Sequence, residues 1–298
     1  MLEKTFFDIL FLGAFTKDTI VSAAAPPRVR NGGAFYYGAN VAARMGLSVA
    51  AVTRLAREDF GIVRELRSLG VYVAATVTPE STRLRIEYPS TDPDERVIRV
   101  ESTSGCFRFE DLQGVRAGVA VIGASLRGEI PDELLRALVS SGCRIALDAQ
   151  GFVRVLRDGI LRYEEWPEAP RVLPMVSILK ADSNEAEILT GTRDLQDAAS
   201  RILAMGAGEA LLTDQRGVHA VGLFGAHAAP FMPHRLVGRS GRGDTCLAAY
   251  ASRRISRPSS EATLWAAAVT SLKLESDAPF HHSLAEVESR ARHIGAGT

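Results

Sequence analysis

The segment of this sequence best suited to chemistry is a glycine-rich turn that leads into a helix. It reads Gly238-Arg-Ser-Gly-Arg-Gly-Asp244, and Leu247 and Tyr250 then fall on one face of the helix. The first amides of a helix have no partner inside the helix, and glycines let the main chain approach an anion closely. The turn therefore predicts an anion-binding site, to which the helix dipole adds positive charge.

An acidic residue at this turn has a second role available. Asp244 could accept the proton of a hydroxyl group while the neighbouring amides hold the phosphoryl group that the hydroxyl attacks. We expect Asp244 to be the catalytic base. The expected anion hole consists of the amides of Gly241, Arg242 and Gly243. Two plainer interpretations stay open: Asp244 as a helix N-cap after a tight turn, and the Arg-Gly-Asp string as an adhesion tripeptide.

Short apolar runs alternate with helical patterns along the chain, and their order predicts the elements that position the turn. Runs at 119–123 and 145–148 flank a helical segment at 131–139, which gives a strand, helix, strand unit. The runs at 177–180 and 210–213, each next to a helical segment, repeat the pattern. We therefore expect an α/β fold with a mainly parallel sheet and helices on both of its faces.

Residues 82–88 and 96–100 follow a different pattern, in which apolar and charged side chains alternate with a period of two. The string Asp92-Pro-Asp94 between them predicts a turn, so the segment is expected to be a β-hairpin set apart from the parallel sheet. Together with the stretch from Asp18 to Gly33, it could cover a cleft. We expect a small β lid formed from about residues 14–33 and 81–101.

Length and composition narrow the class of protein. The 298 residues are 46% hydrophobic and 23% charged, which is typical of a globular chain, and residues 1–298 are expected to form a single domain. The 35 basic and 35 acidic residues cancel, which argues against a nucleic-acid partner. No apolar run approaches the roughly 20 residues that cross a bilayer. The N-terminus lacks a signal-peptide core, so we expect a cytoplasmic protein with no membrane partner.

The glycine-rich turn also resembles the C-terminal signature of the PfkB carbohydrate kinase (ribokinase-like) family, usually Asp-Thr-x-Gly-Ala-Gly-Asp. Further landmarks follow in the family's order. They are Gly13 with Asp18, the diglycine Gly32-Gly33, Arg57-Glu-Asp-Phe-Gly61, the segment 180–191 and Thr213-Asp-Gln-Arg-Gly217. The likeness runs from about residue 7 to about residue 285. It implies a ribokinase-like fold and a kinase that uses ATP and Mg²⁺ to phosphorylate a small polyol.

The resemblance assigns the first group of site residues to the phosphate acceptor. Asp18 would accept hydrogen bonds from hydroxyl groups of the polyol, while a turn residue after a strand is the plainer interpretation. Gly32 and Gly33 would contact the substrate and act as the hinge of the lid, which suits the conformational freedom of glycine.

Two further features indicate a branch of the family. Counted from the diglycine, Tyr37 stands where ribokinase has a substrate-binding asparagine, which argues against a plain ribokinase. Tyr37 and the string Asp148-Ala-Gln-Gly151 look more like the inositol-kinase-like and uncharacterised sugar-kinase branch. In that case Gln150, at the carboxyl end of a strand, would face the substrate.

The resemblance also assigns residues to the phosphoryl donor. Thr213, Asp214 and Gly217 would belong to the nucleotide-binding loop, and Lys273 to the wall of the adenine site. The turn itself departs from the signature, because Arg242 replaces the usual alanine. Backbone amides do not depend on side-chain identity, so the anion hole is still expected.

A second departure affects the metal. Where the family has Asn-x-x-Glu, a motif that organises magnesium near the phosphates, this chain has Asp182-x-x-Glu185. Hard oxygen ligands suit magnesium, so Asp182 and Glu185 are expected at the metal. A helix cap is an equally good interpretation of the pair.

We therefore expect a kinase that transfers the γ-phosphoryl group of ATP to a polyol such as a sugar, an inositol or a nucleoside. One alternative is a catalytically silent nucleotide- or sugar-binding regulator with the same fold. Another is a nucleoside hydrolase or dehydrogenase, which the lack of a Gly-x-Gly-x-x-Gly string after the first strand disfavours. A homodimer through the lid would cover an otherwise unpaired strand edge.

Overall fold

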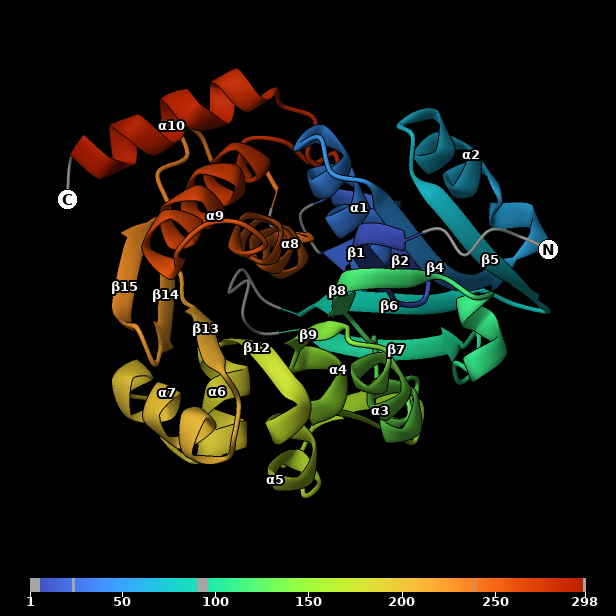
Figure 1. Ribbon diagram of the computed structural model, residues 1–298. Helices are drawn as coiled ribbons and strands as arrows, with labels where there is room; N and C mark the ends of the chain where they lie inside the picture. The colour runs from blue at the N-terminus through green and yellow to red at the C-terminus, as the bar shows by residue number, and fades with distance from the viewer. Residues whose placement is uncertain (1–5, 23–24, 90–95, 239, 297–298) are drawn as a thin grey trace.

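A computed structural model of the chain describes residues 6–22, 25–89, 96–238 and 240–296, and its larger sheet has nine strands (Figure 1). In spatial order the strands are β15 (Gly225–Pro230), β14 (Gly217–Gly222), β13 (Glu209–Thr213), β12 (Val176–Asp182), β9 (Arg144–Asp148), β8 (Arg116–Ile122), β1 (Phe6–Leu12), β4 (Val49–Ala56) and β5 (Tyr72–Thr78). From β13 to β5 all neighbours are parallel, and β14 and β15 continue the sheet in antiparallel pairs.

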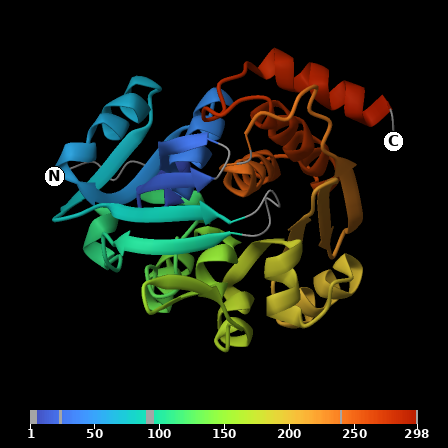
Figure 2. The same cartoon turned by 180° about the vertical axis from the view of Figure 1, so that it is seen from behind.

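Helices cover both faces of this sheet, as Figures 1 and 2 show. One face carries α1 (Ala34–Arg44), α2 (Gly61–Ser68), α8 (Arg242–Arg254), α9 (Ser259–Leu274) and α10 (Leu284–Ala296). The other carries α3 (Asp132–Ser140), α4 (Gln150–Val153), α5 (Ala169–Val172), α6 (Ser183–Thr190) and α7 (Leu195–Ala204). Short 3₁₀ turns lie at Arg57–Asp59, Phe109–Leu112 and Leu173–Met175. In the part of the chain that the structure describes, no helix has the length and apolar character to span a bilayer.

Strand β1 explains why the larger sheet lies between two layers of helices. Its side chains alternate between the two faces of the sheet, and all of those from Ile9 to Leu12 are fully buried. Ile9 and Phe11 belong to the apolar cluster under α1, α8 and α9, whereas Leu10 and Leu12 belong to the cluster on the opposite face. A strand that is apolar on both sides is stable only between two layers of helices.

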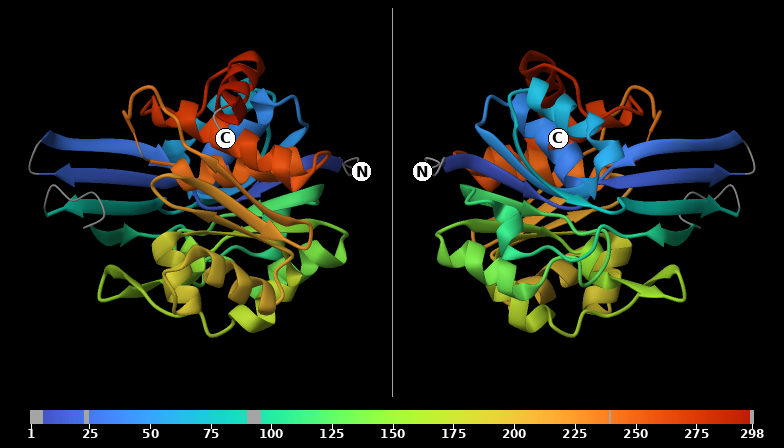
Figure 3. Two further views of the ribbon diagram at one scale, coloured as in Figure 1. Left: turned by 90° about the vertical axis from the view of Figure 1, so that its left-hand side faces the viewer. Right: turned by 90° about the vertical axis from the view of Figure 1, so that its right-hand side faces the viewer.

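A second sheet, here called the lid sheet, projects from this body (Figure 3). Its six strands are, in spatial order, β10 (Arg154–Arg157), β11 (Ile160–Tyr163), β7 (Val97–Ser102), β6 (Thr82–Tyr88), β2 (Thr16–Ser22) and β3 (Ala25–Gly32). The predicted α/β fold with a mainly parallel sheet and a small β lid is confirmed. The predicted turn at Asp92-Pro-Asp94 lies outside the described residues, and the β10–β11 hairpin was not predicted.

Candidate active site

The two sheets and the N-terminus of α8 meet around a cavity of about 780 Å³. The carboxyl ends of β9, β12 and β13, three strands of the nine-stranded main sheet, reach the cavity. Open α/β sheets bind ligands at the carboxyl ends of their strands. Its walls include Asp18, Gly33, Tyr37, Ile86, Ile98, Asp148, Gln150, Arg154, Tyr163, Asp182, Thr213, Asp214, Gly241, Arg242, Gly243 and Asp244. The cavity therefore collects most of the predicted site residues from segments far apart in the sequence.

The anion-binding turn owes its shape to Gly241. This residue caps α8 with a φ of 71°, and a Cβ atom there would lie 2.5 Å from the ring of Tyr37. Only glycine fits both the left-handed backbone and the close ring. The helix begins at Arg242, directly after this cap. Within the described residues, the amides of Arg242, Gly243 and Asp244 donate to no acceptor, as expected for a first helical turn.

Asp244 stands in this first turn with its carboxylate on the cavity wall. It faces Gly123 after β8, where a Cβ atom would lie 4.0 Å from the Asp244 Oδ1. Burial raises the pKa of Asp244 to about 6, against the opposing effect of the cations Lys180 and Arg154. Asp244 is therefore ionised at neutral pH, with a pKa close enough to neutrality to accept a proton during a reaction.

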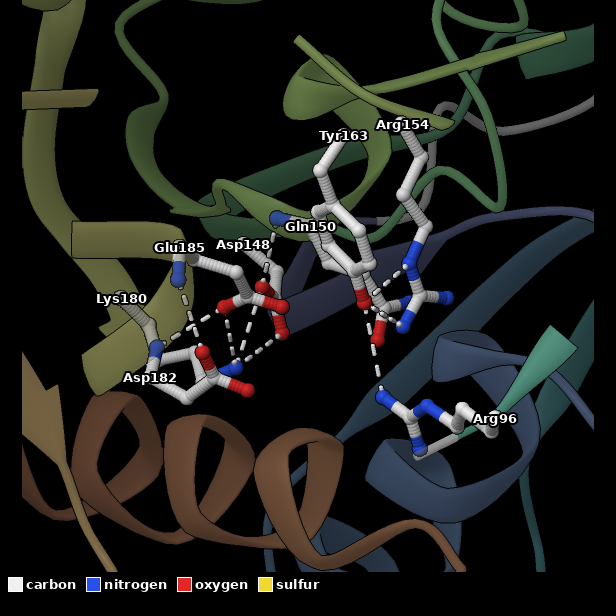
Figure 4. A network of polar contacts seen from close by, with 8 residues as sticks. All are labelled: Arg96, Asp148, Gln150, Arg154, Tyr163, Lys180, Asp182 and Glu185. Atoms are coloured by element: carbon white, nitrogen blue, oxygen red, sulfur yellow. Dashed lines mark hydrogen bonds and ion pairs between the residues drawn. The ribbon is translucent and has the colours of Figure 1, made fainter. Parts of the chain in front are cut away.

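A buried ion cluster lies beneath the turn (Figure 4). The Lys180 Nζ lies 3.2 Å from carboxylate oxygens of both Asp148 and Glu185, and all three side chains are almost inaccessible. Burial raises the pKa of Asp148. Burial alone would lower the pKa of Lys180, but Asp148 and Glu185 outweigh it, so Lys180 stays protonated. A Cβ atom at Gly243 would lie 2.8 Å from the Lys180 Nζ, which places this cation directly under the anion hole.

Asp182 and Glu185 form the helix cap that was one of their two interpretations. The Glu185 amide donates to the Asp182 Oδ1 at 2.9 Å, and the Asp182 amide donates to the Glu185 Oε2 at 2.8 Å. Asp182 lines the cavity, whereas Glu185 is 1% exposed and lies behind it. Among the described residues, no group of three or more His, Cys, Asp or Glu side chains is arranged to hold a metal ion.

Asp18 approaches the cavity from strand β2 of the lid sheet. Its Oδ1 is buried and has no hydrogen-bond partner in the described part of the chain. Burial raises its pKa to about 6, while Thr16 and Arg154 act in the opposite direction. Gly32 lies against this pair, since a Cβ atom there would be 2.5 Å from the Thr16 Oγ1. A buried carboxylate oxygen without a donor suits the hydroxyl group of a ligand.

Gly33, the predicted hinge, and the aromatic residue Tyr37 also line the cavity. Gly33 lines the cavity as the cap of α1 with a φ of 104°, and a Cβ atom there would lie 2.3 Å from the Ala14 carbonyl oxygen. Tyr37 follows on α1 and is 5% exposed, and burial raises its pKa above the ordinary range. Its hydroxyl therefore stays protonated and can donate a hydrogen bond.

The cavity wall around Gln150 includes a residue that sequence reasoning missed. Gln150 lines the cavity as predicted, and its amide donates to the Asp148 Oδ1 at 3.0 Å. Arg154, four residues later, begins β10, is 5% exposed and also lines the cavity. Its charge lowers the pKa values of both Asp18, the predicted acceptor ligand, and Asp244, the predicted base. No local sequence pattern indicated it.

The residues predicted for a nucleotide divide into two groups. Thr213 and Asp214 line the cavity, and Asp214 accepts the amides of Arg216 and Gly217, each at 2.8 Å. Gly217 and Lys273 are absent from the lining, as far as the described residues define it. Lys273 is 1% exposed, and its ammonium lies 5.8 Å from the centroid of the Tyr37 ring. Burial lowers its pKa to about 8.

Comparison with known proteins identifies the family. The model of the pfkB family carbohydrate kinases matches residues 11–279, which is most of the chain. The chain belongs to the pfkB family of carbohydrate kinases. It is therefore a phosphotransferase that acts on a hydroxyl group, and not the hydrolase or dehydrogenase that the sequence left as an alternative. No curated protein sequence matches this pfkB kinase significantly.

Solved structures similar to this pfkB kinase include a pyrophosphate-dependent kinase of the ribokinase family in complex with sulfate. That chain is 33% identical with a TM-score of 0.86, and the match covers 92% of this chain and 97% of that one. A pyrophosphate-dependent kinase with a pyrophosphate analogue and myo-inositol is 31% identical, with a TM-score of 0.86 and coverage of 94% and 99%. The ribokinase of Arabidopsis thaliana with ribose and ATP is 20% identical, with a TM-score of 0.77 and coverage of 97% and 99%, and shares the fold.

Proposed function

We propose that this pfkB kinase phosphorylates a hydroxyl group of a cyclitol such as myo-inositol, with pyrophosphate as the phosphoryl donor. The observation that carries the proposal is the position of Asp244 at the N-terminus of α8, where its carboxylate and the free amides of the first turn face one cavity. The proposed acceptor hydroxyl and the proposed terminal phosphoryl group would meet there.

The acceptor is inferred from the two sides of the cavity. Asp18, Gln150 and Arg154 offer acceptors and donors for hydroxyl groups, and the lid sheet offers aliphatic side chains, among them Ile86 and Ile98. A cyclitol presents hydroxyl groups around its rim and C–H groups on its faces, so both surfaces have a partner. The relative that is 31% identical was solved with myo-inositol, which supports this class of acceptor.

Pyrophosphate is favoured as donor by the relatives that are 31% and 33% identical, both described as pyrophosphate-dependent. In addition, Lys273, which the family resemblance assigned to an adenine site, is buried with its ammonium over the ring of Tyr37. ATP, the donor expected from the sequence, is the second candidate. The observation in its favour is a pair of exposed apolar side chains, Leu236 and Val237, beside the turn that begins at Gly238, where a purine could pack.

In the proposed mechanism the acceptor oxygen attacks the terminal phosphorus and the bond from that phosphorus to the bridging oxygen breaks. Asp244 takes the proton of the hydroxyl group, and the leaving group is inorganic phosphate, or ADP if ATP is the donor. The amides of Arg242 and Gly243 bind the transferring group, with the Lys180 ammonium fixed beneath them. The lid sheet keeps water from competing with the acceptor.

Asp182 fits a role beside magnesium, and Glu185 does not. Only the Oδ1 of Asp182 is used by the helix cap, and kinases commonly hold Mg²⁺ through one or two carboxylates together with phosphate oxygens and water. The Glu185 Oε2 is engaged by the Asp182 amide and by Lys180, behind the cavity wall. When bound, magnesium would neutralise charge on the donor's phosphates.

The proposed function is tested with the purified protein and a matrix of donors and acceptors. We expect myo-inositol monophosphate to form from pyrophosphate and myo-inositol, as followed by phosphorus NMR, at a rate well above those with ribose or inosine. Turnover with ATP and not with pyrophosphate would reject the proposed donor. Turnover with ribose or inosine and not with myo-inositol would reject the cyclitol, and no turnover with any pair would reject the whole proposal.

The role of Asp182 is tested by Asp182→Asn. Asparagine caps a helix as well as aspartate, so we expect an unchanged unfolding midpoint. The loss of one negative charge should raise the Mg²⁺ concentration for half-maximal rate several-fold, measured by titrating Mg²⁺ at saturating donor and acceptor. The matched control is Asp194→Asn, which changes the cap of α7, where the Asp194 Oδ1 accepts the Asp197 amide at 2.8 Å. An Mg²⁺ dependence equal to that of the wild type would contradict a role of Asp182 at the metal and show that it only caps α6.

A further inference from the structure

The side chain of Arg154 is held in the cavity wall by one phenol oxygen (Figure 4). Its Nε and Nη2 donate to the Tyr163 hydroxyl oxygen at 3.2 and 3.0 Å. Among the described residues, no carboxylate forms an ion pair with Arg154, although its side chain is 95% inaccessible to solvent. Its orientation before any ligand binds therefore depends on Tyr163.

The choice of a phenol as partner has an electrostatic consequence. A carboxylate in this place would cancel most of the charge of the guanidinium, whereas a neutral hydroxyl group accepts its hydrogen bonds and leaves the charge available. That charge acts on Asp18 and Asp244, whose pKa values it lowers. In Figure 4 the Arg154 Nη1 has no partner among the residues drawn, so it is free of the phenol.

The same phenol oxygen also joins the hairpin that carries Arg154 to the rest of the lid sheet. Tyr163 pairs directly with Arg154 across the hairpin of β10 and β11, and β11 touches β7 in register only at Ile160 and Arg99 among the described residues. Near the start of β7, the Arg96 Nη2 donates to the Tyr163 hydroxyl oxygen at 3.5 Å. The Tyr163 hydroxyl oxygen thus accepts hydrogen bonds from two separate parts of the lid sheet: from Arg154 on β10 and from Arg96 next to β7.

We propose that Tyr163 is a positioning residue: its hydroxyl oxygen orients the Arg154 guanidinium toward the acceptor and ties that orientation to strand β7 through Arg96. The inference rests on the proposed function, in which Arg154 binds hydroxyl groups of the acceptor beside Asp18. It adds a residue that lines the cavity and acts on the acceptor through Arg154. Its contribution is to binding of the acceptor, because in the proposed function the donor's phosphates bind at the α8 end of the cavity.

The substitution Tyr163→Phe isolates the hydroxyl group. The ring, whose centroid lies 5.4 Å from the Arg154 Cζ, remains, and so does the strand. Hydrogen bonds to a charged group are strong enough that we expect a rise of roughly ten-fold or more in KM for the acceptor. The KM for the donor and the unfolding midpoint should equal those of the wild type. In an Arg154→Lys background, which has no guanidinium to orient, the same change should add less than about two-fold.

The measurement uses the acceptor and donor that the wild type turns over fastest, beginning with myo-inositol and pyrophosphate. The matched control is Tyr72→Phe on β5, where the ring packs on Phe7 away from the cavity lining. Wild-type protein without turnover on any pair would overturn the proposed function and the inference together. A wild type with turnover overturns the inference alone if Tyr163→Phe leaves the acceptor KM unchanged, raises both KM values alike, or has the same effect in the Arg154→Lys background.

Discussion

Asp244→Asn is expected to lower kcat by about 10²–10⁴-fold while the protein stays folded. Asparagine keeps the size of the side chain in the first turn of α8 but cannot accept the proton of the acceptor hydroxyl. The amides of the turn and the ion cluster below it are unchanged, so binding of the donor should persist. The check is steady-state kinetics together with the unfolding midpoint in urea.

The pH dependence of the same pair of proteins gives an independent readout. The pKa of Asp244 is raised to about 6 from an ordinary 3.8, so wild-type kcat/KM should fall as the pH drops through about 6. Ionisation of Asp244 has the opposite effect on the stability of the fold. Between about pH 4 and 6 the folded state holds a proton that the unfolded chain has released, so ionisation of Asp244 destabilises the fold as the pH rises. Asp244→Asn should therefore be more stable than the wild type at pH 8, by at most about 3 kcal/mol, and equally stable at pH 4.

The control for Asp244 is Asp197→Asn. Asp197 occupies the third position of α7, as Asp244 does in α8, but it is exposed and pairs with Arg201 at 2.9 Å. Its loss should change neither kcat nor the acid limb of the pH profile. A kcat for Asp244→Asn within ten-fold of the wild type, or equal effects of both substitutions, would contradict the role of Asp244 as base.

The alternating pattern of the sequence predicted the main sheet because parallel strands are apolar on both faces and their crossover helices have one apolar face. The runs at 119–123 and 145–148 became β8 and β9, with α3 between them as expected. The β10–β11 hairpin escaped prediction because its strands have four residues each and carry arginines and exposed side chains. Short strands of that kind have no period that distinguishes them from a loop.

Some residues of the candidate site could likewise be identified from the sequence, and others could not. Gly241, Gly243 and Asp244 could be identified from the sequence because glycines before an acidic helix start have a local physical meaning. Arg154 and Lys180 could not, because their roles depend on carboxylates far along the chain. Arg154 lowers the pKa values of Asp18 and Asp244, and Lys180 pairs with Asp148. A lysine at the end of an apolar strand was visible in the run 177–180, but nothing local indicated that it would be buried.

That buried lysine gives the second large effect, since Lys180→Met should destabilise the fold by about 3–5 kcal/mol. Asp148 and Glu185 would then share a buried site without the cation that lies 3.2 Å from each of them. Because Lys180 is also the cation that most lowers the pKa of Asp244, its loss should move the acid limb of kcat/KM to higher pH. Urea unfolding and the pH profile measure the two effects separately.

Two further variants separate lost charge balance from lost packing around Lys180. If uncompensated carboxylates cause the instability, adding Asp148→Asn to Lys180→Met should restore part of the lost stability, because one of the two buried charges disappears. The control is Arg136→Met, which removes an exposed cation 2.8 Å from Glu133 and should cost less than about 0.5 kcal/mol. If Lys180→Met were as stable as the wild type, or if Asp148→Asn made it less stable still, uncompensated buried carboxylates would not be the cause of the instability.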